Sequence, residues 1–483
     1  MDMYAVLQSV IASLAEIVVV LGACGLLMAG LFIGNRHSVR LVGATMVVII
    51  AAAIMTLMQA GVTRVAYSGM FVGDDFAVFF KLLFYLATGL AVLMSGRYLD
   101  EENIARGEYY VLLLFALCGM MIMASGLDLL SIYLGLELQA LSIYVLTGFM
   151  REDRRSNEAA LKYVILGAVS SGVFLYGLSL LYGLTGTTQL TAIADALSES
   201  DVTDPGLVLG TVFLVMGLVF KVGAVPLHMW VPDVYEGAPT PITAFLSVAS
   251  KAAAFAVILR IFLDAMGAVA EVWVIVIAVV AVLTMALGSF VALVQTNIKR
   301  MLAYSSIAHA GFVLLGLVAG ARNGVASIML YLLIYAFMNL GIFAAVVMMR
   351  NGDVKGEMID DYTGFAKVNR GLALVMLIFL FSLAGIPPTA GFFAKFYILV
   401  ALVEQGYVAL AVIAVLLSAV AAYFYIRIVM LMYMKEPTRR FDLALTPSLR
   451  LTLAVTVSGT VGLGLFPGRF LDLAQAAVFS GIG

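Results

Sequence analysis

The chain has 483 residues, of which 64% are hydrophobic and only 12% are charged. This composition excludes an ordinary soluble domain and is typical of a polytopic membrane protein. The formal net charge of −2 gives no indication of a nucleic-acid partner. Two cysteines, Cys24 and Cys118, are too few for a disulfide framework, an iron–sulfur cluster or a zinc site. No Walker loop or dinucleotide fingerprint is present, so the chain has no recognisable nucleotide-binding module.

Long apolar runs dominate the chain from end to end. A run of about 20 residues crosses a hydrocarbon layer of about 30 Å, and the sequence contains fourteen such runs. They predict an all-α membrane protein whose loops are too short to hold a soluble catalytic domain. The runs lie near 9–33, 41–62, 76–95, 109–125, 128–149, 159–183, 205–225, 240–262, 271–293, 301–320, 324–349, 371–401, 407–433 and 451–466.

The basic residues of the loops alternate between the two sides of the membrane. We call the side that holds the first loop, with Arg36 and Arg40, side A, and the opposite side, side B. Side A loops carry seventeen lysines and arginines, including Arg439 and Arg440 near the C-terminus. Side B loops carry three, Arg64, Arg322 and Arg469. Because positive charge favours the cytoplasmic side, we expect side A to be cytoplasmic, with both termini on side B of a bacterial inner membrane.

Two of the predicted spans are interrupted by proline beside a lysine. In the seventh span, Lys221 is followed by Pro226 and Pro232, and in the twelfth, Pro387-Pro388 precede Lys395. Proline removes a helix hydrogen bond and a lysine in hydrocarbon is costly, so both need a cavity or a neighbouring helix to compensate. Discontinuous helices of this kind point to an ion path in a transporter-type fold.

The spacing of these features predicts an internal repeat. The interrupted spans are five apart, as are the spans that hold Glu137 and His309, and those that hold Lys251 and Arg427. An odd offset gives the two units opposite topology, as in inverted five-helix repeats. The expected organisation is N-terminal helices in 1–108, a first repeat in 109–265, an inverted second repeat in 266–434 and a C-terminal helix in 435–483.

Glu137 and three lysines are the strongest candidates for chemistry. A buried lysine can release its proton near neutral pH and a nearby carboxylate favours its charged form, so a Glu–Lys contact can load and unload a proton. Glu137, Lys221, Lys251 and Lys395 all lie within predicted spans, where ionisable groups are usually functional. The alternative is that they form static ion pairs. Lys162 lies closer to side A and could instead reach the interface.

Other polar side chains leave two interpretations open. His228 and His309 could relay protons or could be hydrogen-bonded packing residues. Arg427, which follows Tyr425, could equally have a role in the proton path or in packing. Lys81 and Arg260 lie near span ends and are expected to reach the headgroups, and Glu16 is expected to contact a neighbouring helix. Serines such as Ser171, Ser305 and Ser306 could hold water chains or join helices, and no spacing argument separates these roles.

Several stretches resemble the antiporter-like membrane subunits of respiratory complex I, and the resemblance covers nearly the whole chain. They are Glu137-Leu-Gln-Ala-Leu141, Glu158-Ala-Ala-Leu-Lys-Tyr163, the segment from Phe220 to Pro241, the segment from Asn297 to Gly311 and the segment from Leu383 to Phe396. The run His228-Met-Trp-Val-Pro-Asp-Val-Tyr-Glu-Gly-Ala-Pro239 is long and specific to this family.

The resemblance implies a role for each candidate residue. Glu137 and Lys221 would form a coupling pair, Lys251 a central relay, and Lys395 the path to side B, with His309 between them. The resemblance assigns Lys162, His228 and Arg427 less firmly. It further implies that NADH, FMN, the iron–sulfur clusters and quinone belong to other subunits, and that the partners are neighbouring membrane subunits and the lipid bilayer. A cation/proton antiporter subunit of the Mrp type, without a redox partner, is the alternative function.

Overall fold

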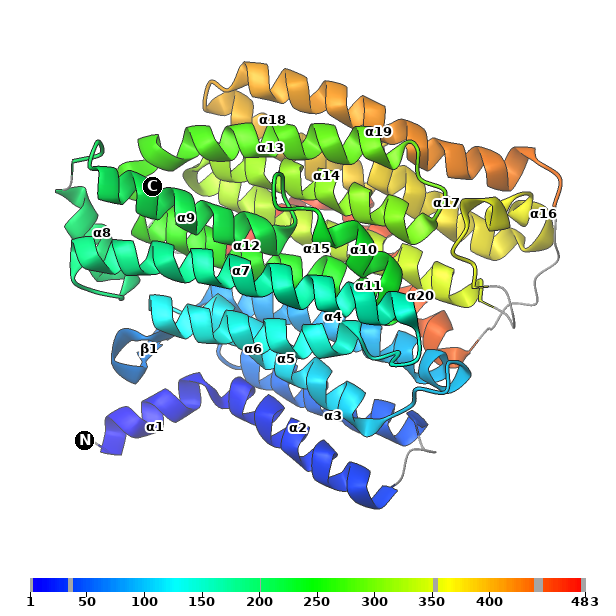
Figure 1. Ribbon diagram of the computed structural model, residues 1–483, viewed down its shortest axis with the longest axis horizontal. Helices are drawn as coiled ribbons and strands as arrows, with labels where there is room; N and C mark the ends of the chain where they lie inside the picture. Colours follow the sequence, from blue (N-terminus) through cyan, green and yellow to red (C-terminus); the bar gives the residue numbers. More distant parts are fainter. Residues whose placement is uncertain (1–2, 34–37, 200, 351–354, 438–445, 479–483) are drawn as a thin grey trace.

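The computed structural model describes residues 3–33, 38–199, 201–350, 355–437 and 446–478. Arg36, Arg439 and Arg440, which contribute to the side A count, lie outside the described residues. The described chain is a bundle of helices whose long axes run side by side (Figure 1). The first part comprises α1 (Met3–Ala12), α2 (Leu14–Ile33), α3 (Ser38–Leu57), the hairpin β1 (Arg64–Ala66) and β2 (Phe71–Gly73), α4 (Asp75–Glu101), α5 (Gly107–Ser125), α6 (Leu129–Thr147), α7 (Arg154–Thr185) and α8 (Leu190–Ser198).

The remaining helices contain both interruptions. They are α9 (Pro205–Val222), α10 (Trp230–Gly237), α11 (Thr240–Phe245), α12 (Lys251–Leu259), α13 (Ala270–Ala292), α14 (Ile298–Ala319), α15 (Ala321–Met348), α16 (Phe365–Val368), α17 (Arg370–Ala384), α18 (Ala390–Glu404), α19 (Val408–Met434), α20 (Pro447–Leu465) and α21 (Pro467–Ala476). Wider π-helical turns at Leu246–Ser250 and Arg260–Ala265 flank α12, so that α11 and α12 form one continuous but irregular span.

The helical membrane fold predicted from the sequence is confirmed. Thirteen helices among the described residues are long and apolar enough to cross a membrane. The predicted twelfth span, 371–401, comprises two short helices, α17 and α18, which are separated by residues 385–389. The predicted side B loop 184–204 holds the amphipathic helix α8, whose Leu190, Ile193 and Leu197 are buried.

Burial divides the bundle into a core and a periphery. The span formed by α11 and α12 is 100% buried over its apolar window, and α14 is 94% buried, whereas α2, α3 and α19 are only 28% buried. In Figure 1, α2 and α3 lie at the opposite edge of the bundle from α18 and α19. The lysine-bearing helix α12 therefore lies in the core, while the edge helices present apolar side chains to the bilayer.

Side-chain caps fix where several helices begin. Asp74 accepts a hydrogen bond from the backbone of Ala77 at the start of α4, Asp204 caps α9, and Asn297 caps α14. Such caps satisfy the free N–H groups of a first turn, which have no partner within the helix. The cap of α14 sets the position of the polar residues that follow along this helix.

Candidate functional site

Both predicted interruptions are present in the structure. α9 and α10 are separated by residues 223–229, and α17 and α18 by residues 385–389. Gly223 and Gly385 follow the first halves and have φ values of +72° and +83°. This left-handed backbone conformation is accessible to glycine at no steric cost. Each break leaves the last carbonyl groups of the first half free to accept hydrogen bonds from other groups.

Lys395 uses the carbonyl groups freed by the second break. Its side chain is only 7% exposed. Its Nζ donates to the carbonyl oxygens of Ala384 at 2.9 Å and Leu383 at 3.3 Å, and to Ser418 Oγ at 2.9 Å. The two carbonyls lie at the C-terminal end of α17, where the helix dipole favours a positive charge. α17 therefore supports the buried Lys395 side chain, which contacts no carboxylate of the described residues.

Lys251 has a comparable environment at the start of α12. It is 4% exposed, and its Nζ donates to the backbone oxygen of Ser306 at 2.9 Å and to Ser306 Oγ at 2.5 Å. The hydroxyl groups of Ser306 and Tyr235 lie 3.2 Å apart. A Cβ atom added to Gly223 would lie 3.9 Å from Lys251 Nζ, so this lysine is placed against the break between α9 and α10.

His309 is held on both sides by tyrosine hydroxyl groups. Its Nδ1 lies 2.6 Å from Tyr331 OH and its Nε2 lies 3.1 Å from Tyr425 OH. Tyr425 OH also hydrogen-bonds Ser305 Oγ. Because Ser305 and His309 are one helical turn apart, the tyrosine closes a small hydrogen-bonded ring on the face of α14.

α14 lies between the two buried lysines. Ser306, His309 and Phe312 are spaced three residues apart and therefore lie along one side of the helix. Lys251 binds Ser306 at one end of this row, and Lys395 Nζ lies 5.3 Å from the ring centre of Phe312 at the other. The row spans roughly 9 Å along the helix axis, at 1.5 Å per residue. The structure thus places Lys251, His309 and Lys395 along one side of α14.

Glu137 and Lys221 are close but do not form a direct contact. Lys221 is 9% exposed in the last turn of α9, and its Nζ has no hydrogen-bond partner among the described side chains and backbone groups. Glu137 on α6 is half-buried and instead accepts a hydrogen bond from Ser171 at 2.5 Å. The conformation described here is therefore one in which this predicted pair is separated.

Lys162 belongs to a charged cluster at side A. Its Nζ lies 2.7 Å from Asp233 Oδ2 on α10 and 2.8 Å from Glu158 on its own helix. The other carboxylate oxygen of Asp233 lies 2.8 Å from Arg300 on α14. Asp233 therefore connects a cation from α7 with a cation from α14.

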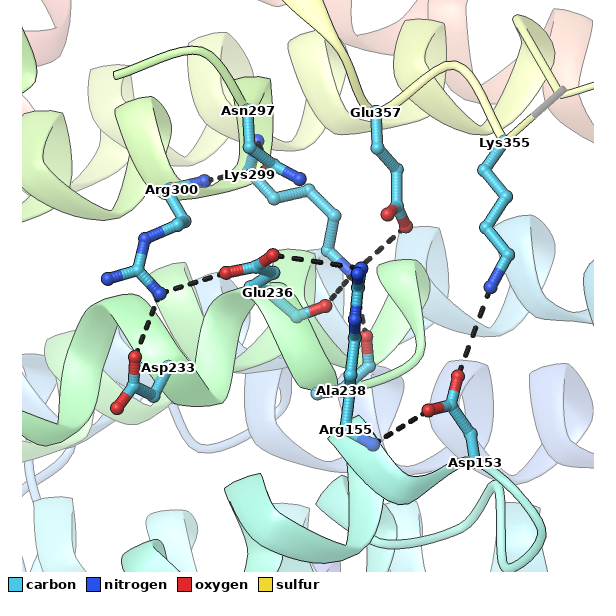
Figure 2. A network of polar contacts seen from close by, with 10 residues as sticks. All are labelled: Asp153, Arg155, Asp233, Glu236, Ala238, Asn297, Lys299, Arg300, Lys355 and Glu357. Carbon is cyan, nitrogen blue, oxygen red and sulfur yellow. Dashed lines mark hydrogen bonds and ion pairs between the residues drawn. The ribbon is translucent and has the colours of Figure 1, made fainter. Parts of the chain in front are cut away.

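Figure 2 shows how this cluster continues around the end of α10. Arg300 also contacts Glu236 at 2.8 Å, and Glu236 lies 3.9 Å from Arg155 on α7. Lys299, which is 1% exposed, donates to the backbone oxygens of Glu236 and Ala238 at 2.8 Å each. Ion pairs and hydrogen bonds thus tie the second half of the broken helix to both α7 and α14.

The structure does not join His228 and Arg427 to the row on α14. His228 lies half-buried in the connection between α9 and α10, and its Nδ1 has no hydrogen-bond partner among the described residues. Arg427 Nη1 donates to the carbonyl oxygen of Leu293 at the end of α13, at 3.0 Å. Its side chain lines a small surface cavity near side A with Tyr423 and Lys435.

The expectation that Lys81 and Arg260 reach the headgroups is wrong. Lys81 is 2% exposed and lies 2.6 Å from Glu16 on α2. Arg260 is 1% exposed and donates to both oxygens of Asp74, at 2.9 and 3.0 Å. Since each cation has a carboxylate partner inside the bundle, neither needs water at the interface.

Sequence reasoning missed the groups that hold the candidate residues in place. Asp233 lies within the motif after Lys221, but its bonds to Lys162 and Arg300 span 71 and 67 residues. Ser418, Tyr331 and Tyr425 are isolated hydroxyl-bearing residues within apolar spans. No local pattern distinguishes them from packing residues, so only the fold identifies them as partners of Lys395 and His309.

No group of three or more histidine, cysteine or acidic side chains that could hold a metal ion occurs in the described residues.

Comparison with known proteins identifies the family to which the chain belongs. The family model for the NADH:quinone oxidoreductase/Mrp antiporter transmembrane region matches residues 126–421. The chain therefore belongs to this family of antiporter-like membrane subunits, and the resemblance inferred from the motifs is confirmed.

Individual relatives narrow the class. The chain is 66% identical over 477 residues, 99% of each chain, to NADH-quinone oxidoreductase subunit N 2 of Rhizobium meliloti. It is 30% identical to a chain in the structure of respiratory complex I from Thermus thermophilus, with a TM-score of 0.81 and coverage of 95% of this chain and 99% of that one. A chain of the Mrp complex from Dietzia sp. is 22% identical, with a TM-score of 0.83 and coverage of 98% and 97%, and shares the fold.

Proposed function

We propose that the chain is a proton-translocating membrane subunit of a respiratory complex I. It would couple NADH:quinone electron transfer in other subunits to proton movement across the membrane. The observation that carries the proposal is the row on α14, where a serine, a histidine and an aromatic ring separate two buried lysines. Neither lysine contacts a carboxylate in the described part of the chain. A buried ammonium held by neutral acceptors can release its proton without leaving an unpaired carboxylate behind.

Each candidate residue has a proposed role in this path. Lys221 receives a proton when Glu137 approaches it, Lys251 passes the proton along α14 through Ser306 and His309, and Lys395 delivers it toward side B. Lys162 collects protons at side A, while His228 and Arg427 have supporting roles at the two ends of the broken repeats. The division into two inverted five-helix repeats, 109–265 and 266–434, is part of the same proposal.

The proposal includes an orientation and a set of partners. Side A faces the cytoplasm of a bacterial cell, both termini lie on the opposite side of the inner membrane, and neighbouring membrane subunits of the complex cover part of the exposed apolar surface. NADH, FMN, iron–sulfur clusters and quinone are assigned to other subunits. The half-buried position of Glu137 on α6 supports a neighbouring subunit on that face, because a carboxylate facing lipid is costly.

Co-purification tests this function against the Mrp-type alternative. The membrane is solubilised gently, the chain is captured by an affinity tag, and the accompanying proteins are identified by mass spectrometry. The proposal predicts subunits that oxidise NADH and contain flavin and iron–sulfur clusters. A set of small hydrophobic proteins without a redox subunit, together with sodium-dependent proton exchange in vesicles, would instead establish the antiporter.

A further inference from the structure

The first turns of α7 and the whole of α10 run antiparallel and are joined by successive pairs of side chains. Nearest to side A, Arg155 lies 3.9 Å from Glu236. Deeper in the bundle, Lys162 lies 2.7 Å from Asp233. These two pairs line a cavity of about 220 Å³, together with Arg300. A polar cavity of this size holds several water molecules. Water from side A therefore reaches Lys162, whose side chain is 42% exposed.

The next pair along the same two helices is aromatic and buried. Tyr163 is stacked on Trp230, with ring centres 4.4 Å apart and an angle of 10° between the ring planes. Tyr144 packs edge-on against Tyr163 at 4.7 Å, and Phe220 lies 5.4 Å from Trp230. Exposure falls to 4% at Tyr163 and 2% at Trp230. Tyr163 thus lies on the buried face of α7 with Ser156 and Ala159, while the side chain of Lys162 beside it is exposed to the cavity.

Trp230 also spans the break next to the buried lysine. Its indole Nε1 donates to the carbonyl oxygen of Phe220 at 3.1 Å. Phe220 immediately precedes Lys221, and its carbonyl, in the last turn of α9, also accepts the backbone N–H of Gly223. The ring that packs against α7 is therefore fixed to the backbone that carries Lys221.

We propose that Tyr163 and Trp230 are positioning residues that close the side A end of the proton path. The inference rests on the proposed function, since it names the residues that control access to Lys221. Proton transfer requires a continuous chain of hydrogen-bonding groups or water, and the stacked ring faces offer none. The pair holds the cavity water on the Lys162 side, and protons reach Lys221 only when α10 moves relative to α7 and the rings separate.

We call the stacked pair of Tyr163 and Trp230 the seal. The charged pairs on the side A side of the seal can drive the movement of α10. Asp233 is three residues from Trp230 on the same short helix, and it is shared between Lys162 and Arg300. A change in the charge of Lys162 alters the force on α10 at this point, because the remaining bond to Arg300 pulls the helix toward α14. α10 has eight residues and its chain connection to α9 is the irregular segment 223–229, so it can shift as a unit once the bond from Trp230 to Phe220 is broken.

A passive leak assay tests the seal directly. The intact complex, carrying Trp230→Ala in this chain, is reconstituted into liposomes with a pH-sensitive dye inside. A pH gradient is imposed without NADH, so that no turnover occurs. The proposal predicts proton leak several-fold faster than in the unaltered complex, counted per assembled complex. Leak equal to that of the unaltered complex would overturn it.

A matched control exists because the chain has only two tryptophans. Trp273 on α13 is equally buried, at 1% exposure, and its indole donates to the carbonyl of Met266 at 3.1 Å. Trp273→Ala removes the same volume away from the path and is expected to leave the leak unchanged. Equal leak from both variants would show that any large cavity in the bundle conducts protons, which contradicts a specific seal.

Tyr163→Phe tests whether Tyr163 blocks the path with its ring or transfers protons through its hydroxyl group. The substitution keeps the ring and removes the hydroxyl, so leak and NADH-driven pumping should both stay near their original values. Loss of pumping without leak would mean that the hydroxyl carries protons, and the seal would be rejected. Trp230→Phe keeps an aromatic ring but loses the bond to Phe220, so it should leak less than Trp230→Ala.

Thiol labelling gives a second readout for variants that assemble poorly. Ala224 is fully buried in the segment 223–229, three residues after Lys221. Ala224→Cys should react with a water-soluble maleimide from side A only when Trp230→Ala is also present. Labelling of the native Cys24 and Cys118 is subtracted using the chain without the added cysteine. Neither assay needs electron transfer. A Trp230→Ala variant that shows no faster proton leak and no labelling at Ala224→Cys would therefore reject the seal without testing the proposed function. Failure of the proposed function would appear instead as pumping that survives loss of Lys221.

Discussion

At the residue scale, the three buried lysines differ in what they contact. Lys395 donates to three neutral acceptors and Lys251 to the two oxygens of Ser306, whereas Lys221 has no hydrogen-bond partner in the described structure. A buried charge is stable only where polar groups replace the water it has lost. Lys221 is therefore the lysine that most needs a neighbouring polar group to move toward it before its charged form is stable. Its position next to a helix break is consistent with such a movement.

Ser418→Ala tests whether neutral acceptors hold the proton on Lys395. The substitution removes one of three acceptors, so the ammonium should be less stable and pumping should fall several-fold. Lys395→Ala should reduce pumping further. Pumping is measured as dye quenching in proteoliposomes at a fixed rate of NADH oxidation.

Thr452→Ala serves as the matched control for this substitution. Thr452 is fully buried, whereas Ser418 is half-buried, and among the described residues the Thr452 hydroxyl bonds only to the backbone of Ser448 in its own helix, at 3.0 Å. Pumping should be unchanged in this variant. If Ser418→Ala and Thr452→Ala behave alike, the hydroxyl of Ser418 has no specific role at Lys395.

At the scale of elements, the breaks combine a left-handed glycine with a neighbouring lysine. A Cβ atom at Gly385 would lie 3.1 Å from Lys395 Cδ and 3.2 Å from its Nζ. The second break therefore forms part of the lysine's binding environment as well as ending a helix.

Gly385→Ala should displace Lys395 in addition to straining the backbone. The left-handed conformation costs an alanine about 1–2 kcal/mol. Gly406 has the same φ of +83° with nothing within 4 Å, so Gly406→Ala carries the strain without the contact. Pumping per assembled complex should fall only for Gly385→Ala. Equal loss in both variants would attribute the effect to backbone strain.

The buried pair between α2 and α4 makes a separate prediction about stability. Removing one partner of a buried ion pair costs about 3–5 kcal/mol, because the other charge stays buried alone. Lys81→Met should therefore lower the thermal stability of the complex sharply, and adding Glu16→Gln should restore much of it. Thermal unfolding monitored by subunit release measures both, and a double variant less stable than Lys81→Met would contradict the pairing.

The elements that could be predicted from the sequence are those that a short stretch of residues specifies by itself. Apolar runs predicted the spans, and proline beside lysine predicted both breaks. The burial of Lys81 and Arg260 could not be predicted, because their partners are distant in sequence. Glu16 reaches Lys81 through the packing of α2 on α4, and Asp74 reaches Arg260 because the start of α4 lies against the end of the span that contains α12. The separation of Glu137 from Lys221 likewise depends on side-chain conformations that no sequence pattern specifies.

At the scale of the whole molecule, the charged network at side A joins both halves of the bundle. Residues from α7, α10 and α14 meet there, and the loop that carries Lys355 and Glu357 joins them (Figure 2). The same network lines the cavity that contains Lys162, the residue before Tyr163. Movement of α10 would therefore displace side chains in the half that holds Lys395 as well as in the half that holds Lys221.

Cysteine accessibility tests the proposed orientation of the molecule. Lys367 is exposed in a side A loop and Glu199 is exposed in a side B loop. Glu199→Cys should react with an impermeant maleimide in spheroplasts, because side B faces outward there. Lys367→Cys should react only in inverted membrane vesicles, and the reverse pattern would place side A outside the cell.

The central claim is that buried lysines couple electron transfer to proton movement. The most direct test is Lys221→Ala in the purified complex, with NADH oxidation and proton uptake measured on the same proteoliposomes. The account predicts that electron transfer to an artificial acceptor continues while pumping is lost. Pumping at the original ratio of protons to electrons, in a fully assembled variant complex, would contradict the account.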